Sequence, residues 1–249
     1  MASGGELRKS VLGGSHVNLT SSLEDAGIVD ELPSAAASAT DVSNNDGLKI
    51  PELLLSPGMF VDGLVSVVNC PADIFVQPLI FEATINLLNK ALNRFYQVLS
   101  EGELDISMEF YHKTGGMCVA KYEDGCWYRA VFLGRSAPSR AEVLFIDYGN
   151  VDRVPLTDCK VLVKKFSTER IRPLAINCTD AFADRIDGDV FKQAIEGHKV
   201  VLKIVDNDDE EAPVVVEVFV IGKGINSEGE LNFSRQLAGV FEDEQTPAV

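Results

Sequence analysis

The residues of this chain with the clearest chemical potential are aromatic side chains gathered in one short stretch. Aromatic rings that converge on a point attract a cation through their negative faces, by roughly 0.5–2 kcal/mol per well-placed contact. A guanidinium is flat and weakly hydrated, and methylation makes it more apolar while keeping its charge. Such a cluster therefore suits an arginine side chain, which Asn150 could hydrogen-bond from the rim. The aromatic residues are Tyr122, Trp127, Tyr128, Phe132, Phe145 and Tyr148.

The block that contains these aromatic residues has the pattern of a small β-barrel. Alternating apolar and polar residues predict four short strands, and turn residues at hairpin spacings separate them. Four tightly connected antiparallel strands of this kind curl into a small barrel. The predicted strands cover residues 117–122, 127–133, 141–147 and 151–154.

The pattern alone leaves two interpretations of the aromatic cluster open. Core filling is the better interpretation for Trp127 and Phe132. Tyr122 and Tyr148 lie in or beside turns rich in glycine and aspartate, where core filling is less natural. Phe145 is expected with them at the open mouth of the barrel. A cation cage and a packed core are equally supported at this point.

The segments on either side of this block predict a second, β-rich fold around one long helix. Apolar residues recur at helical spacing over residues 79–99 and define one buried face. That face is formed by Phe81, Ile85, Leu88, Leu92, Phe95 and Leu99. Strands are predicted at 59–68, 73–76 and 174–178, a short helix at 190–195, a hairpin of 200–205 with 214–221, and a last apolar segment at 237–241. This order indicates two halves of one domain with the barrel inserted between them.

The charge of the chain favours basic partners. The formal net charge is −16, which repels phosphate backbones and attracts cationic peptides, although many proteins are acidic only for solubility. Residues 112–165 carry more lysine and arginine than aspartate and glutamate. We therefore expect acidic surroundings for a site in the barrel rather than an acidic floor, and direct nucleic-acid binding is disfavoured. The basic patch from Lys164 to Arg172 is interpreted as a solvated linker.

The cysteines and the hydropathy pattern favour a reducing, cytoplasmic environment. The five cysteines are scattered without a CxxC pair, and Cys118 and Cys126 are expected to be buried thiols. Neither a signal peptide nor a membrane-spanning stretch is seen, so no membrane association is expected. Residues 1–50 have the composition of a disordered tail, and residues 242–249 form an acidic tail.

Catalysis and metal binding find no support in the sequence. The three histidines, His16, His112 and His198, are far apart, and the common nucleophile, phosphate-loop and metalloprotease motifs are absent. The acidic run at residues 206–211 lacks the spacing of a calcium loop and is interpreted as a solvated hairpin tip. We therefore expect a non-enzymatic protein without a cofactor.

Two motifs at this separation resemble those of Tudor domains: Asp124-Gly-Cys-Trp-Tyr-Arg-Ala130 and Phe145-Ile-Asp-Tyr-Gly-Asn150. The order of the flanking elements resembles the extended Tudor module, and the resemblance covers about residues 55–241. It implies a mainly β fold with α (α+β), in which a Tudor SH3-like β-barrel is inserted into a staphylococcal-nuclease-like OB-fold barrel with one long helix. The implied barrel covers residues 112–165, and the implied OB-fold halves cover 51–111 and 166–241.

The resemblance also implies a ligand. The family's aromatic cage falls on Tyr122, Tyr128, Phe145 and Tyr148, and its polar rim residue falls on Asn150. Members with this cage bind symmetrically dimethylated arginine in Arg-Gly or Arg-Ala peptides, commonly the tails of Piwi-family proteins. That implies a role in small-RNA silencing and germ-granule assembly, in cytoplasmic, perinuclear ribonucleoprotein granules.

Four alternatives stand beside this interpretation. Some extended Tudor modules prefer unmethylated arginine. A nuclease would need clustered carboxylates and arginines on the flanking sheet, and no such constellation is seen in residues 59–111 or 173–222. An RNA-binding module would depend on the basic patch after the barrel. The extended form of the module disfavours a reader of methyl-lysine.

Overall fold

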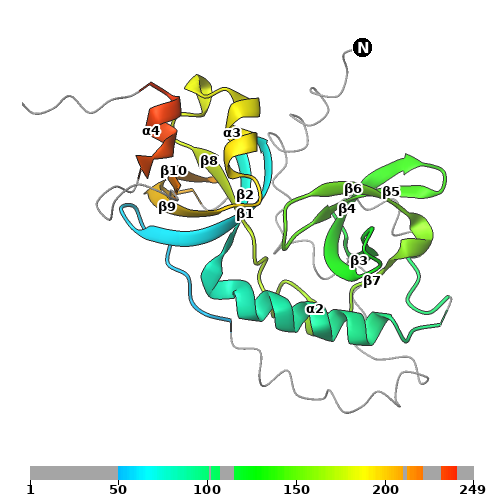
Figure 1. The fold of residues 1–249 in the computed structure, drawn as a ribbon. Coiled ribbons are helices and arrows are strands. Elements are labelled where there is room, and N and C mark those ends of the chain that lie inside the picture. The colour runs from blue at the N-terminus through cyan, green and yellow to red at the C-terminus, as the bar shows by residue number, and fades with distance from the viewer. Residues whose placement is uncertain (1–49, 101, 107–114, 210–211, 221–230, 240–249) are drawn as a thin grey trace, which may run out of the picture. The chain divides into compact units, whose positions relative to one another are not determined.

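The computed structural model describes residues 50–100, 102–106, 115–209, 212–220 and 231–239 (Figure 1). Residues 1–49 of the predicted N-terminal tail, the predicted acidic tail at 242–249, and His16 and His112 lie outside the described residues. The chain forms two compact units. We call Ala91–Leu144 with Val151–Arg172 the inserted unit, and Asp46–Lys90 with Phe145–Asn150 and Pro173–Val249 the flanking unit.

The flanking unit is a closed barrel of five strands. Strands β1 (Phe60–Cys70), β2 (Asp73–Pro78), β8 (Ile176–Asp180), β10 (Val214–Val220) and β9 (Lys199–Asp206) pair in that order, and β9 pairs back with β1. The β8–β10 pair is parallel and the others are antiparallel. Strand β11 (Leu231–Asn232) adds to β10. This topology confirms the predicted OB-fold class.

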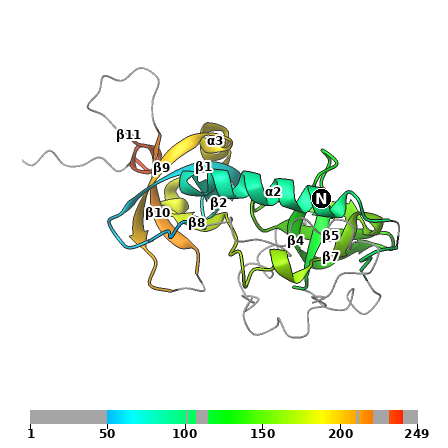
Figure 2. The same cartoon turned by 90° about the horizontal axis from the view of Figure 1, so that it is seen from below.

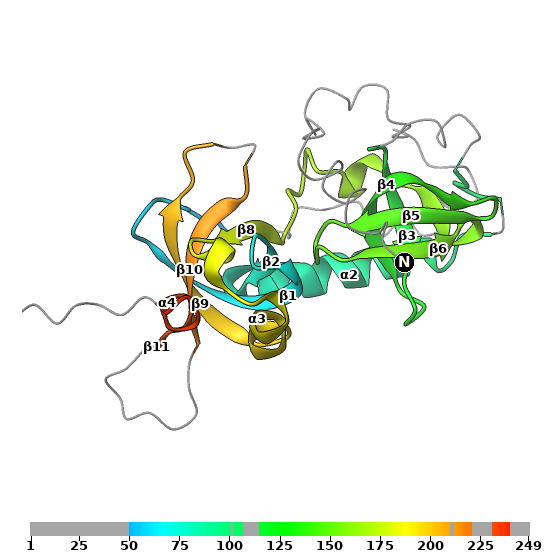
Figure 3. The same cartoon turned by 90° about the horizontal axis from the view of Figure 1, so that it is seen from above.

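Two short helices complete the flanking unit (Figures 1 and 3). Helix α3 (Gly188–Ile195) connects β8 to β9, follows the 3₁₀ turn η8 (Ala183–Arg185), and begins at Asp187, whose carboxylate accepts from two backbone N–H groups. Its apolar side packs into the barrel core with Phe191 and Ile195 fully buried. Helix α4 (Phe233–Leu237) is capped by Asn232 and starts earlier than the predicted last apolar segment at 237–241.

The inserted unit is a five-stranded sheet that includes one strand more than the sequence predicts. Its strands are labelled in Figure 1, and Figure 2 shows the sheet from below. Its strands are β3 (Met117–Lys121), β4 (Trp127–Ala137), β5 (Arg140–Phe145), β6 (Val151–Pro155) and β7 (Cys159–Val161), in the order β6-β5-β4-β3-β7. The extra strand β7 spans only three residues and pairs with β3. Its sequence is too short for a pattern, so only pairing with β3 identifies it. The turns η6 (Leu156–Asp158) and η7 (Lys164–Phe166) flank it.

The long helix α2 (Glu82–Tyr96) follows the 3₁₀ turn η4 (Leu79–Phe81) and passes from the flanking unit into the inserted unit after Lys90. The predicted apolar face is buried, apart from Leu99, which lies beyond the helix and is half-buried. Tyr96 is also buried at 1% exposure, and its hydroxyl donates to the carbonyl of Val161 at 2.9 Å and accepts from the N–H of Val163 at 3.0 Å. Burial raises the pKa of Tyr96 well above its usual value, so this phenol stays neutral.

The segment from Lys164 to Arg172 is the predicted solvated linker only in part, since Arg170 and Arg172 are exposed but the main chain is packed. Arg129 in β4 is fully buried, and its guanidinium donates to the carbonyls of Phe166, Ile171 and Arg172 at 3.1, 2.5 and 3.0 Å. The ammonium of Lys165 lies 3.9 Å from the ring centroid of Phe95. Part of the basic patch is therefore held within the inserted unit.

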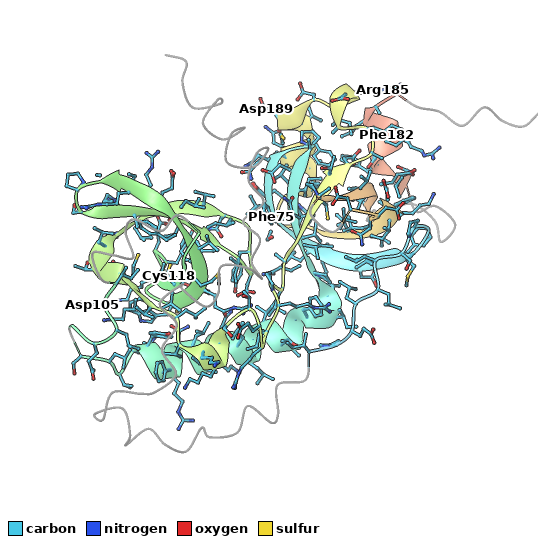
Figure 4. The ribbon with its side chains drawn as sticks, turned by 180° about the vertical axis from the view of Figure 1, so that it is seen from behind. Phe75, Asp105, Cys118, Phe182, Arg185 and Asp189 are labelled. Atoms are coloured by element: carbon cyan, nitrogen blue, oxygen red, sulfur yellow. The ribbon has the colours of Figure 1, made fainter. Side chains whose placement is uncertain are left out.

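The cysteines follow the expected pattern in part. Cys118, labelled in Figure 4, is fully buried in the inserted unit, whereas Cys126 is only half-buried. Burial, with the nearby Cys159 thiol as a smaller cause, raises the pKa of Cys118. All five cysteines are free thiols. Among the described residues no helix is long and apolar enough to cross a membrane.

Candidate functional site

A pair of tyrosines stands at the hairpin between β3 and β4. The rings of Tyr122 and Tyr128 meet edge to face, with centroids 6.4 Å apart and planes at 83°. Asp124 fixes this arrangement, because one carboxylate oxygen accepts from the Tyr128 hydroxyl at 2.7 Å and the other from the N–H of Cys126 at 2.9 Å. The N–H of Tyr122 donates to the Cys126 carbonyl at 2.9 Å and closes the turn. A short local sequence thus builds an ordered aromatic corner.

This corner lies in a negative electrostatic environment. Tyr122 is 37% exposed, and its pKa is raised by partial desolvation and by the charges of Glu123, Asp152 and Asp124. The surroundings of Tyr122 are thus acidic, and the nearby carboxylates belong to the inserted unit itself. An exposed aromatic pair beside several carboxylates suits a cation, since ring quadrupoles and charges attract it together.

The second group of predicted site residues lies in the loop between β5 and β6. The N–H groups of Tyr148 and Gly149 donate to the carbonyl of Phe145 at 3.1 and 2.7 Å, and the N–H of Phe145 donates to the carbonyl of Asn150 at 2.9 Å. These bonds fold residues 145–150 into a tight turn. Tyr148 and Asn150 are half-buried, whereas Phe145 is only 2% exposed. Phe145 lies at the end of β5 with its side chain buried, and its place in the cage stays a prediction.

The main chain of this turn is held by strands β1 and β2. Ser66 Oγ donates to the carbonyl of Tyr148 at 2.5 Å, and Gln77 Nε2 donates to the carbonyl of Asp147 at 2.7 Å. The buried carboxylate of Asp147 accepts from the N–H of Leu174 at 3.0 Å. Side chains of the flanking unit therefore set the path of the 145–150 turn.

Gly149 is required in this turn for two reasons. Its φ of +94° lies in the left-handed region, which side chains rarely adopt. A Cβ on Gly149 would lie 1.9 Å from a ring carbon of Phe75, which is labelled in Figure 4. The turn thus packs directly against the aromatic ring of β2.

Tyr148 also borders a hollow in the flanking unit. Its phenol oxygen accepts from Asn89 Nδ2 of α2 at 2.7 Å. The hollow has a volume of about 230 Å³, and both apolar and polar side chains line it. Its lining residues are Leu64, Gln77, Pro78, Leu79, Glu82, Ile85, Asn86, Tyr148 and Lys199.

The predicted site residues are thus brought together in two sets. Tyr122 and Tyr128 contact each other in the inserted unit, and Phe145, Tyr148 and Asn150 share one turn in the flanking unit. The convergence of all five on one ligand stays a prediction. Trp127 and Phe132 are 3% and 0% exposed, which confirms both as core residues.

Sequence reasoning missed the residues that hold these aromatic rings. Ser66 and Gln77 belong to no motif, and Asp124 belongs to the first motif but was not singled out. Asn89 lies on the polar side of α2. Only Asp124 had a local signal, since an aspartate two residues before Cys126 can accept its backbone N–H in the turn. Among the residues that the structure describes, no group of three His, Cys, Asp or Glu is placed to hold a metal ion.

Comparison with known proteins identifies a matching protein family and relatives of similar sequence. A family model described as Tudor domain matches residues 55–179. Mouse RING finger protein 17 is 30% identical over 136 residues, which make up 54% of this chain and 8% of that protein. The chain therefore spans less than a tenth of the length of this relative.

Solved structures share the fold. The extended Tudor domain of human TDRD1, in complex with a symmetrically dimethylated peptide, matches with a TM-score of 0.57 at 23% identity, over 72% of this chain and 89% of that one. The extended Tudor domain TD3 of mouse TDRD1, in complex with a MILI peptide containing dimethylarginine, matches with a TM-score of 0.56 at 21% identity, over 70% and 88%. The fold is that of an extended Tudor domain.

Proposed function

This chain belongs to the Tudor domain family, and from that premise we propose that it binds peptides through a symmetrically dimethylated arginine. Tyr122, Tyr128, Phe145 and Tyr148 form the aromatic cage, and Asn150 hydrogen-bonds the guanidinium. Phe145, which is buried, provides the floor of the cage, and the tyrosines provide its walls.

The observation that carries this proposal is the tyrosine corner with its carboxylates. The edge-to-face pair of Tyr122 and Tyr128 presents ring surface to solvent, and Glu123, Asp124 and Asp152 add negative charge beside it. A tyrosine that only fills a core rarely has carboxylates beside it, because burying an uncompensated charge is costly. A methylated guanidinium gains from both features, since it is cationic and partly apolar.

The proposed partner is the arginine-methylated tail of a Piwi-family protein, with Arg-Gly or Arg-Ala sequence. The complex of the mouse TDRD1 domain with a dimethylarginine-containing MILI peptide supports this class of ligand. The chain then acts as a non-enzymatic reader and scaffold in small-RNA silencing, in cytoplasmic germ granules. The net charge of −16 supports a basic peptide over a nucleic acid.

Calorimetric titration of one Arg-Gly peptide in three forms tests the proposal: symmetrically dimethylated, unmethylated, and with lysine in place of arginine. We expect affinity to fall in that order. Tyr148→Ala should weaken binding of the methylated peptide by about tenfold or more, since it removes a cation–π contact.

The matched control is Phe60→Ala, which truncates another exposed aromatic side chain of the flanking unit, one that pairs with Phe219. It should bind as the wild type does. Equal affinity for the arginine and lysine peptides would contradict the cage. Preference for the unmethylated peptide would instead favour the alternative that this domain reads unmodified arginine.

A further inference from the structure

One hydrogen bond connects the long helix to an aromatic residue of the proposed site. Asn89 Nδ2 of α2 donates to the phenol oxygen of Tyr148 at 2.7 Å, across 59 positions of sequence. Both residues belong to the flanking unit and are half-buried. The sequence assigns Asn89 to the polar, solvent-facing side of the helix, so this contact was not expected.

The contact holds the phenol end of Tyr148, which the main-chain bonds of its turn do not involve. The N–H of Tyr148 donates to Phe145, and its carbonyl accepts from Ser66, so the main chain is held on both sides. Neither bond restricts rotation of the ring about the side-chain torsions. Asn89 holds the phenol oxygen at the far end of the ring and thereby selects one direction in which the side chain points.

Ring orientation matters for the proposed ligand. The attraction between a cation and an aromatic ring requires the cation to lie over the ring face, because the ring edge carries the opposite partial charge. A ring that samples several rotamers loses that arrangement for part of the time and must be ordered when the ligand binds. We propose that Asn89 is a positioning residue that preorganises Tyr148 for the methylated guanidinium. This inference rests on the proposed cage.

Helix energetics distinguish this role from a merely structural one. Asparagine is a poor helix former and leucine a good one, and position 89 lies in the interior of α2. Replacing Asn89 with leucine therefore favours the helix itself, while it deletes the bond to Tyr148. If Asn89 served only stability, this replacement would change the melting temperature and affect the binding of all peptides alike.

The test is a double-mutant cycle of Asn89→Leu with Tyr148→Phe, measured by titration with the dimethylarginine peptide and by thermal melting. Tyr148→Phe keeps the ring and removes only the oxygen that Asn89 contacts. We expect each single variant to bind about three- to tenfold more weakly, as for one lost hydrogen bond. The double variant should be no weaker than either single one, because the two changes delete the same bond. The melting temperatures should not fall with affinity.

Asn86→Leu is the matched control, since Asn86 lies one turn earlier on α2 and lines the hollow beside Tyr148. It should leave affinity unchanged. The inference is overturned if Asn89→Leu binds as the wild type does, if the two single effects multiply in the double variant, or if Asn86→Leu weakens binding equally.

A measurement on the free protein separates this inference from the proposed function. Ring signals of labelled Tyr148 in nuclear magnetic resonance spectra should show greater disorder in Asn89→Leu than in the wild type, with or without a ligand. If the Tyr148 ring is as ordered in Asn89→Leu as in the wild type, the positioning role is wrong, but the proposed function is not affected. If the wild-type protein has an ordered Tyr148 ring but binds no arginine peptide, the proposed function is wrong, but the positioning of the ring by Asn89 is not contradicted.

Discussion

Phe145 and Tyr148 lie three residues apart in one turn, yet their side chains have different environments. Phe145 is 2% exposed at the end of β5, whereas Tyr148 is half-buried and borders a hollow. The same truncation should therefore have different consequences at the two positions. Loss of a buried ring removes packing from a core, while loss of a partly exposed ring removes chiefly a binding surface.

We predict that Phe145→Ala lowers the free energy of unfolding by about 3–5 kcal/mol, the usual cost of truncating a buried phenylalanine. Tyr148→Ala should cost much less. Urea denaturation of both variants, followed by the fluorescence of the single tryptophan Trp127, measures the difference. A Phe145→Ala protein as stable as the wild type would show that the ring contributes little to the core, and its loss of binding could then be assigned to the cage.

At the scale of elements, helix α4 is attached to the flanking barrel by a buried polar cluster. Ser234 Oγ donates to the carboxylate of Asp180 and accepts from the N–H of Val218 at 2.6 Å. Asp180 is 1% exposed, and its other oxygen accepts from the N–H of Phe182 at 2.9 Å. Nearby, Glu217 accepts from Arg235, and Lys203 lies beside Glu217. Burial and the charge of Glu217 favour the neutral form of Asp180, whereas the hydrogen bonds from Ser234 and Phe182 favour its charged form.

Burial is the largest cause that raises the pKa of Asp180 to about 6 from its ordinary 3.8, with Glu217 adding to it. At pH values between these two, the Asp180 carboxyl is therefore protonated in the folded state and ionised in the unfolded state. We predict that this carboxyl favours folding fully below pH 3.8 and that its contribution, on the order of 3 kcal/mol, is lost as pH rises through about 6.

Asp180→Asn, which resembles the protonated acid, removes this titration. The difference in unfolding free energy between Asp180→Asn and the wild type, measured in urea from pH 4 to 8, should shift in favour of the variant as pH rises. A difference that stays constant across this range would mean that Asp180 titrates alike in the folded and unfolded chains.

The inserted unit depends on residues outside the predicted barrel boundaries at 112–165. Asn93 accepts from the N–H of Trp127 at 2.8 Å, and the rings of Tyr96 and Trp127 have centroids 5.8 Å apart. Beyond residue 165, three carbonyls accept from the buried Arg129. Removing the N-terminal flank leaves Trp127 without these partners, and removing the C-terminal flank leaves the buried guanidinium of Arg129 without its acceptors.

We predict that a fragment of residues 112–165 does not fold cooperatively, whereas a fragment of residues 91–172 is markedly more ordered. Circular dichroism melting and size-exclusion chromatography of both fragments provide the comparison. A monomeric 112–165 fragment with a cooperative melt would show that the barrel folds without α2 and the 166–172 segment, and that the boundaries predicted from the sequence suffice.

At the scale of the whole molecule, the net charge of −16 should act on peptides that carry several arginines. One cation in an aromatic cage supplies only a few kcal/mol, and the ordering of a flexible peptide offsets much of it. Additional arginines gain from the acidic surface, and exposed charge pairs are screened over roughly 8–10 Å at 0.1–0.15 M salt.

We predict that a peptide with several arginines binds more tightly than one with a single methylarginine, and that this advantage shrinks as salt rises. The cage contribution should persist, because it is short-range and partly desolvated. Titration of both peptides at low and high salt is the measurement. Affinities that fall in parallel, or that do not change, would mean that the net charge serves solubility and does not guide recognition.

The sequence by itself determined the local elements and the types of residues in the proposed site. Apolar alternation and helical spacing defined the strands and α2, because side-chain direction has a fixed period in each element. The two motifs around Trp127 and Tyr148 identified the aromatic residues. The short strand β7 and the buried role of Arg129 escaped prediction, since neither has a local pattern and both depend on distant partners.

Only the tertiary structure decided how the site residues are held. Ser66 and Asn89 contact Tyr148 across 82 and 59 positions, and Gln77 holds Asp147 across 70. Burial of Phe145 likewise follows from packing, because its place at the end of a strand suits an exposed or a buried ring equally. The physical reason is that periodicity reports which side of an element a residue occupies, whereas exposure and hydrogen-bond partners depend on which other segment packs there.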